Sequence, residues 1–159
     1  MNYKNYPAFK GPVLFLSSGT YLGNIPIASG TFGTLWGLPL FYWLSGRWLW
    51  TQVFIIIVSI LLAVFLAGRA EEIWGRKDPP QVVIDEIVGY MTAMFGLAFS
   101  WKMALAGFFL FRAMDIIKPY PIRKIDRSMP GGWGIVLDDV LAGIYCQAIL
   151  QLLVYYNLI

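Results

Sequence analysis

The stretch Gly131-Gly-Trp-Gly-Ile-Val-Leu-Asp-Asp-Val-Leu-Ala-Gly143 decides the fold of this chain. A glycine-rich turn leads directly into an apolar segment that continues to the last residue, Ile159. Asp138 and Asp139 lie about one helical turn inside that segment. A charge in hydrocarbon costs several kcal/mol, so acids within membrane segments usually pair, bind a cation or face water. The sequence therefore predicts a partner for these two carboxylates elsewhere in the chain.

The composition is that of an integral membrane protein. Apolar residues make up 58% of the 159 residues and charged residues 13%, whereas a soluble domain carries about 25% charged residues. The length predicts a single domain, residues 1–159. The net charge of +3 is too small to indicate a nucleic-acid partner. The single cysteine, Cys146, excludes a disulfide within the chain, and the absence of histidine leaves carboxylates as the main titratable groups.

Hydrophobic runs predict about five membrane-spanning helices. Residues 1–30 mix aromatic, basic, proline and glycine positions, and we expect them to lie at the interface or to re-enter without crossing. The expected spans are 31–45, 51–68, 82–99, 103–117 and 134–159. The first is shorter than the roughly 20 residues that cross a bilayer unaided. A polar loop, 69–80, and a basic loop, 120–133, connect the spans on one side.

The distribution of charge predicts the orientation of these spans. With five alternating spans, ten basic residues fall on one side and only Arg47 and Lys102 on the other, which places the larger group in the cytoplasm. The ten are Lys4, Lys10, Arg69, Arg76, Lys77, Arg112, Lys118, Arg123, Lys124 and Arg127. All nine acidic residues fall on that same side. The expected fold is therefore an all-α, polytopic membrane helical bundle with its polar site at the cytoplasmic face.

Two of the polar clusters begin expected spans. Ile27-Ala-Ser-Gly-Thr-Phe-Gly-Thr34 offers small residues and hydroxyls, and free backbone N–H groups at a helix start suit a phosphate. An N-cap with glycines for close helix packing explains the same residues. Asp85 and Glu86 begin the third expected span, where the helix dipole alone favours acids. The dipole accounts less well for their apolar neighbours.

A third cluster ends the fourth expected span. Arg112, Asp115 and Lys118 recur every three residues and share one helical face. They form either a phosphate clamp or a salt-bridged helix end whose long side chains reach the interface. Two prolines then turn the chain, and the basic run Arg123–Arg127 follows. That run suits a phosphate or, alternatively, the headgroups of anionic lipids.

Carboxylates from two helices point to metal chemistry. Asp85 and Glu86, with Asp138 and Asp139, supply up to four oxygen ligands without histidine or cysteine, a set that suits Mg²⁺. Such an ion activates water and neutralises phosphoryl charge, and neighbouring cations would clamp that charge. The combination at one face predicts phosphoryl chemistry on a lipid.

Four stretches, in order along the chain, resemble the signature blocks of the phosphatidylglycerophosphatase A family. They are Pro26–Thr34, Val83–Gly89, Phe111–Ile122 and Gly131–Gly143, and the resemblance covers residues 13–150. It implies a magnesium-dependent phosphatase of the bacterial inner membrane that acts in phospholipid biosynthesis. The reaction would remove the terminal phosphate of phosphatidylglycerophosphate and yield phosphatidylglycerol. The departures from the family pattern fall at uncharged positions.

This hypothesis assigns a role to each polar residue. The metal ligands are expected to be Asp85, Glu86, Asp138 and Asp139. Groups that hold the substrate phosphate are expected to be Thr31, Arg112, Lys118 and Arg123. The expected catalytic residues are Asp85, Asp139 and Asp115, the last as a base or as the group that orients Arg112. The substrate is an anionic phospholipid, and membrane lipids surround the chain.

Two other classes of protein also carry intramembrane carboxylates. A CDP-alcohol phosphotransferase, another enzyme of phospholipid headgroups, requires an Asp-Gly-x-x-Ala-Arg pattern, which this sequence does not contain. A non-enzymatic transporter would move ions and release no phosphate. Within the phosphatase hypothesis, direct attack by water and an aspartyl-phosphate intermediate both fit the residues, and the sequence indicates no oligomeric state.

Overall fold

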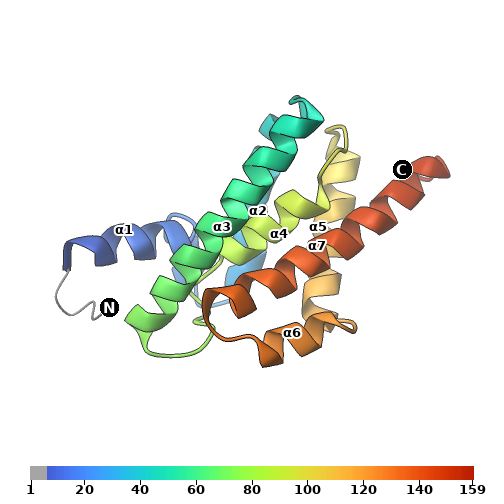
Figure 1. Cartoon of the computed structure of the whole chain (residues 1–159). Helices are drawn as coiled ribbons and strands as arrows, with labels where there is room; N and C mark the ends of the chain where they lie inside the picture. Colours follow the sequence, from blue (N-terminus) through green and yellow to red (C-terminus); the bar gives the residue numbers. More distant parts are fainter. Residues whose placement is uncertain (1–6) are drawn as a thin grey trace.

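The computed structural model describes residues 7–159, and every regular element within them is helical (Figure 1). Residues 1–6, and with them Lys4 of the charge count, lie outside the described residues. The elements are α1 (Pro7–Ser17), the 3₁₀ turn η2 (Leu22–Asn24), α2 (Ser29–Ser45), α3 (Leu49–Trp74), α4 (Ile84–Ala93), α5 (Trp101–Ile117), α6 (Ile122–Ser128) and α7 (Gly131–Tyr155). The all-α prediction is confirmed.

Two helices among the described residues are long and apolar enough to cross a membrane: α3, with 26 residues, and α7, with 25. The prediction of about five such helices is therefore not confirmed. Helices α2 and α5 have 17 residues each and α4 has 10, all below the roughly 20 that cross a bilayer unaided. Helix α1 has 11 residues, which agrees with an N-terminal segment that does not cross.

The third expected span is short because the chain turns after Ala93. Gly96 adopts a left-handed φ of 71°, which ends helical continuation, and the chain then runs without regular structure to Ser100. The Gly96 N–H donates to the buried Gln52 side chain of α3 at 3.0 Å, so this freed backbone group stays paired. The Ser100 hydroxyl then caps α5 by accepting from the Met103 N–H at 3.0 Å.

The surface of α3 is that of a membrane helix. Six large apolar side chains in its middle are between 46% and 68% exposed: Phe54, Ile57, Val58, Leu61, Leu62 and Phe65. A water-soluble monomer rarely exposes a contiguous apolar face of this size, whereas lipid covers it at no cost. The lengths of α3 and α7 and this exposed face together indicate a membrane protein.

Helix α4 lies at the centre of the bundle and packs against α7, α2 and α3 (Figure 1). It meets α7 at Gly89 and Gly143, where a Cβ on Gly143 would fall well inside contact distance of the Gly89 carbonyl oxygen. On its other side, the buried Tyr90 hydroxyl donates to the Ala104 carbonyl of α5 at 2.9 Å. These contacts fix α4 between α5 and α7.

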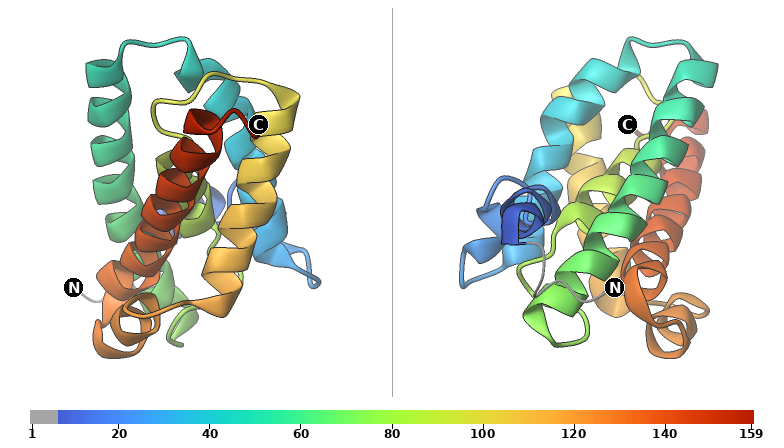
Figure 2. Two further views of the ribbon diagram at one scale, coloured as in Figure 1. Left: turned by 90° about the vertical axis from the view of Figure 1, so that its right-hand side faces the viewer. Right: turned by 60° about the vertical axis from the view of Figure 1, so that its left-hand side comes forward.

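The two ends of the bundle differ in the elements that form them (Figure 2). The α2–α3 connection, the α4–α5 connection and the C-terminus lie at one end, which carries Arg47 and Lys102. The α3–α4 connection and α6 lie at the other end. Two expected loops are partly helical: α3 continues through Arg69 to Trp74, and the basic loop 120–133 contains α6 and the start of α7. The membrane side of each end stays a prediction.

Candidate functional site

A cavity of about 460 Å³ opens where α4, α5 and α7 converge near the α6 end of the bundle. Polar side chains from all three helices face it, together with the start of α2 and the α3–α4 connection. Its lining comprises Pro26, Ala28, Ser29, Gly30, Arg76, Asp78, Pro80, Val82, Asp85, Glu86, Arg112, Asp115, Lys118, Ile135, Asp138 and Asp139. The structure thus brings together segments that are more than one hundred residues apart in the chain.

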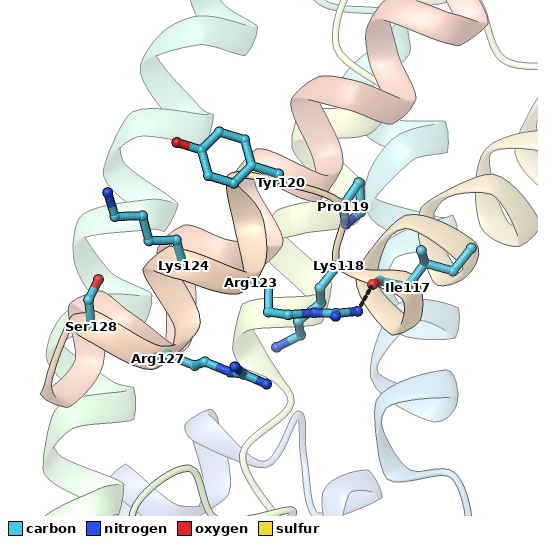
Figure 3. Close-up of a pocket in the computed structure, with 8 residues that line it drawn as sticks. All are labelled: Ile117, Lys118, Pro119, Tyr120, Arg123, Lys124, Arg127 and Ser128. Carbon is cyan, nitrogen blue, oxygen red and sulfur yellow. Dashed lines mark hydrogen bonds between the residues drawn. The ribbon is translucent and has the colours of Figure 1, made fainter.

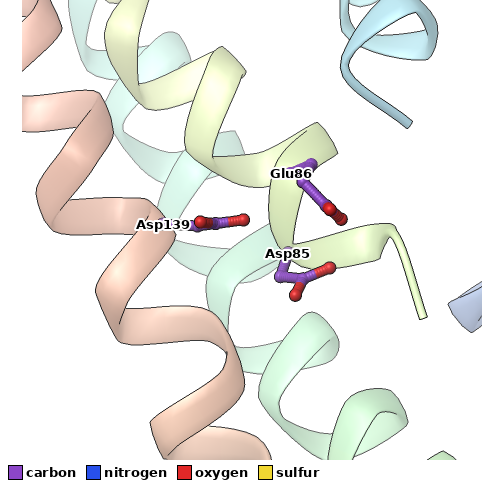
Figure 4. Close-up of side chains that lie close together, drawn as sticks. All are labelled: Asp85, Glu86 and Asp139. Carbon is purple, nitrogen blue, oxygen red and sulfur yellow. The ribbon is translucent and has the colours of Figure 1, made fainter. Parts of the chain in front are cut away.

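Three carboxylates form a compact group in this cavity (Figure 4). Asp85 and Glu86 come from the first turn of α4 and Asp139 from α7, and one oxygen of each lies within 4.8 Å of the others. Asp85 is 6% exposed and Asp139 is 3% exposed. Carboxylates this close and this deeply buried repel one another strongly unless a cation or a shared proton compensates their charge.

The group fits a divalent cation. Oδ1 of Asp85 and Oε2 of Glu86 are buried without a hydrogen-bond partner, and such atoms are costly unless they bind something. Among the described residues Asp139 makes no ion pair. An all-oxygen ligand set is the one that Mg²⁺, Ca²⁺ and Mn²⁺ prefer. The arrangement is therefore compatible with a metal ion, and the donor set alone does not select which one.

Asp138, expected as a fourth ligand, points to a different partner. Its Oδ2 accepts a hydrogen bond from the Lys118 Nζ at 2.5 Å, and Lys118 also lies 3.5 Å from Asp126 of α6. Burial opposes the charged form of Lys118, but the hydrogen bond to Asp138 and the negative charges of Asp138, Asp126 and Asp139 together outweigh it and raise the pKa of that ammonium group. The two neighbouring acids of α7 thus have separate positions: Asp139 lies in the carboxylate group, and Asp138 holds a lysine.

Arg112 connects the carboxylate group to α5. Its Nη1 lies 2.7 Å from Oδ2 of Asp115, one helical turn away, and 3.9 Å from Oε1 of Glu86. The three side chains are only 13% to 17% exposed, so water screens these charges weakly. Arg112 and Lys118 therefore present two fixed cations at the cavity that also contains the carboxylates. A dianion such as a phosphomonoester fits between cations and a bound metal ion.

Gly30, at the start of α2, allows Glu86 to reach this position. A Cβ at residue 30 would overlap Oε1 of Glu86 and lie 3.0 Å from Nη1 of Arg112. The absence of a side chain therefore brings the backbone of α2 directly against the acidic group. Ser29 also lines the cavity. The helix start that was expected to bind phosphate does border the site.

Two of the expected phosphate-binding residues do not line this cavity. Thr31 is half-buried one residue beyond the lining. Arg123 borders a separate cavity on α6, where its Nη2 donates to the Ile117 carbonyl at 2.9 Å. The structure also adds Arg76 and Asp78, which we had interpreted only as part of a charged loop. Burial raises the pKa of Asp78. The sequence does contain a signal for these two residues: Pro79 and Pro80 stiffen the loop that leads from them to Asp85.

These features define a class of protein: a helical membrane protein with a buried acidic group that can bind metal, next to two fixed cations. Comparison with known proteins agrees with that class. The family model described as phosphatidylglycerophosphatase A matches residues 15–154. The chain is 33% identical to the phosphatidylglycerophosphatase A of Escherichia coli K12 over 140 residues, 87% of this chain and 81% of that protein.

Two further relatives are similarly close. A phosphatidylglycerophosphatase A of Haemophilus influenzae is 36% identical over 150 residues, covering 92% of this chain and 91% of the relative. A protein of Bacteroides thetaiotaomicron named putative phosphatidylinositol-3-phosphatase is 35% identical over 145 residues, 84% of this chain and 87% of the relative. No solved structure matches the chain. The chain belongs to the phosphatidylglycerophosphatase A family, as the sequence blocks predicted, and this makes it a phosphatase.

Proposed function

We propose that the protein hydrolyses phosphatidylglycerophosphate to phosphatidylglycerol and inorganic phosphate in phospholipid biosynthesis, with Mg²⁺ as its cofactor. The observation that carries this proposal is the single cavity in which Asp85, Glu86 and Asp139 lie beside Arg112 and Lys118. The name shared by the family and two relatives supports the lipid substrate. The transporter alternative lacks such support, because the family is one of enzymes.

Asp85, Glu86 and Asp139 would hold the magnesium ion, and Asp138 would hold Lys118 in place. When bound, such an ion lowers the pKa of a coordinated water and neutralises charge on the phosphoryl oxygens. Mg²⁺ typically takes one or two protein carboxylates and completes its shell with water and substrate phosphate oxygens. Three carboxylates that each give one oxygen would leave half of an octahedral shell for water and substrate oxygens.

The remaining side chains bind and orient the phosphate. Arg112 and Lys118 would each donate to phosphoryl oxygens, and their acidic partners keep them in place: Asp115 for Arg112, and Asp138 for Lys118. Positioned cations of this kind stabilise the charge of the transition state because they need no reorganisation during the reaction. In hydrolysis the oxygen of water bonds to phosphorus, the bond from phosphorus to the glycerol oxygen breaks, and that oxygen leaves with a proton.

We place this cavity at the cytoplasmic face of a multi-pass protein in the bacterial inner membrane. The cavity lies at the end of the bundle that carries α6, whose residues belong to the larger basic group of the charge count. Basic residues concentrate on the cytoplasmic side of inner-membrane proteins. The variant Lys124→Cys, made on a Cys146→Ala background, tests this orientation. A membrane-impermeant thiol reagent should label its introduced thiol only from the cytoplasmic side.

The relative named a putative phosphatidylinositol-3-phosphatase makes substrate choice the first experiment. Purified protein in vesicles should release phosphate from phosphatidylglycerophosphate with a kcat/KM on the order of 10²-fold or more above that for phosphatidylinositol 3-phosphate. The rigid, bulkier inositol ring holds its phosphomonoester differently from a glycerol unit, and a misplaced phosphate leaves charged groups of the site unpaired. Phosphate release measured at equal mole fractions of the two lipids tests this. A preference for the inositol lipid, or turnover of soluble phosphomonoesters alone, would overturn the proposal.

A further inference from the structure

A second cavity, of about 620 Å³, lies beside the first at the junction of α5 and α6 (Figure 3). It is lined by Ile117, Lys118, Pro119, Tyr120, Arg123, Lys124, Arg127 and Ser128, and we call it the α6 basic pocket. Lys118 lines both cavities. The α6 basic pocket and the proposed catalytic cavity therefore share the Lys118 side chain.

The α6 basic pocket carries an uncompensated positive charge. No acidic residue is part of its lining, and among the described residues Arg123, Lys124 and Arg127 make no ion pair. Arg123 and Arg127 extend to the same side as Lys118, whereas Lys124 points away (Figure 3). The two unpaired cations Arg123 and Arg127, on the side that Lys118 also faces, attract an anion.

The walls of the same pocket are apolar and suit the glycerol ester region of a lipid. Ile117 is 58% exposed and Tyr120 is 79% exposed, and Ile116 beside them is 71% exposed. Exposed aromatic and aliphatic side chains next to basic ones are typical of the level at which a bilayer changes from hydrocarbon to headgroups. The occupant that matches this combination is a phospholipid phosphate with its acyl chains along the end of α5.

We propose that the α6 basic pocket binds the phosphodiester group of the substrate lipid, while the terminal phosphate of the same molecule occupies the catalytic cavity. This inference rests on the function proposed above. Phosphatidylglycerophosphate has two phosphates separated by one three-carbon glycerol unit, and the two cavities are neighbours that share Lys118. The pocket thus favours lipids that carry a phosphodiester next to the terminal phosphate, with Arg127 as a specificity residue.

The test compares Arg127→Gln with Lys10→Gln. Each variant loses one exposed positive charge, but Lys10 lines neither cavity. Arg127→Gln should raise the KM for phosphatidylglycerophosphate by about tenfold, since hydrogen bonds to a charged group contribute on that scale, with the larger share of the loss in KM. Lys10→Gln should leave KM within about twofold because surface charge alone contributes little. Arg127→Lys should recover most of the loss.

Two inhibitors separate the pockets. Phosphatidylglycerol carries the diester phosphate alone, so its inhibition of the wild-type protein should weaken by about tenfold in Arg127→Gln, again on the scale of one charged hydrogen bond. Inhibition by inorganic phosphate, which fits the catalytic cavity, should stay the same in that variant. An unchanged KM and unchanged inhibition by phosphatidylglycerol would overturn the inference, and so would an equal effect of Lys10→Gln. A wild-type protein without activity on phosphatidylglycerophosphate would instead overturn the proposed function.

Discussion

Asp139→Asn is expected to lower kcat for phosphatidylglycerophosphate by on the order of 10³-fold, the scale on which loss of one preorganised electrostatic group acts. Asp139 is the only contribution of α7 to the carboxylate group, and it makes no ion pair among the described residues. An amide keeps the shape of the side chain, but its neutral oxygen binds a divalent cation more weakly than a carboxylate does. Phosphate release at saturating Mg²⁺ measures the effect, with Glu72→Gln, an exposed acid outside the cavity, as the matched control.

The stability of Asp139→Asn separates a metal ligand from a structural ion pair. In the presence of a chelator, the variant should have an unfolding temperature equal to or above that of the wild-type protein. The reason is that the substitution removes one of three mutually repelling carboxylates. Loss of one partner of a buried salt bridge would instead cost about 3–5 kcal/mol. A destabilised variant, or one with full activity, would contradict the assigned role.

Gly143→Ala is expected to destabilise the bundle by about 2 kcal/mol and to lower activity with it. The added Cβ would overlap the Gly89 carbonyl oxygen of α4, which is backbone and cannot rotate away. Overpacking costs about 1–3 kcal/mol, and contact with a backbone atom puts this case at the upper end. The better helix propensity of alanine offsets about 1 kcal/mol of that cost. Because this crossing also places Asp85 beside Asp139, the shift separates the two carboxylates.

Gly46→Ala provides the control for that substitution. Gly46 follows α2 with a negative φ of −84°, and a Cβ there would meet nothing within 4 Å. Thermal unfolding in detergent should leave Gly46→Ala within about 0.5 kcal/mol of the wild-type protein, the range of surface substitutions. Equal stability of Gly143→Ala and Gly46→Ala would show that the α4–α7 crossing is looser than described.

The sequence was enough to predict that acids of two helices gather in one place but not how each of them pairs. Hydrophobic patterning and the acids at 85, 86, 138 and 139 predicted helices that bring carboxylates together, and the structure places three of them in one group. Adjacent helical residues point about 100° apart. At the first turn of α4 both Asp85 and Glu86 nevertheless join the group, whereas on α7 only one of Asp138 and Asp139 does. Which one does depends on the rotation of α7 about its axis, which the contact of Gly143 with Gly89 fixes and which no local pattern encodes.

Other features were missed because they depend on contacts between distant segments. Hydropathy cannot show that α4 ends early, because the residues after Ala93 stay apolar while Gly96 turns and pairs with Gln52 of α3. Likewise, Arg76 and Asp78 belong to the cavity only because their loop folds back toward α6, where the Lys77 Nζ donates to the Asp126 carbonyl at 3.0 Å.

The most direct test of the account is the metal dependence of phosphate release from phosphatidylglycerophosphate by purified protein in vesicles. We predict that chelation abolishes release, that Mg²⁺ restores it, and that the concentration of Mg²⁺ needed rises on the order of 10-fold to 100-fold in Glu86→Gln, the loss typical when a group at a metal site is removed. Release that continues unchanged in the chelator, with the same rate in wild-type and Glu86→Gln protein, would contradict a metal site formed by these carboxylates.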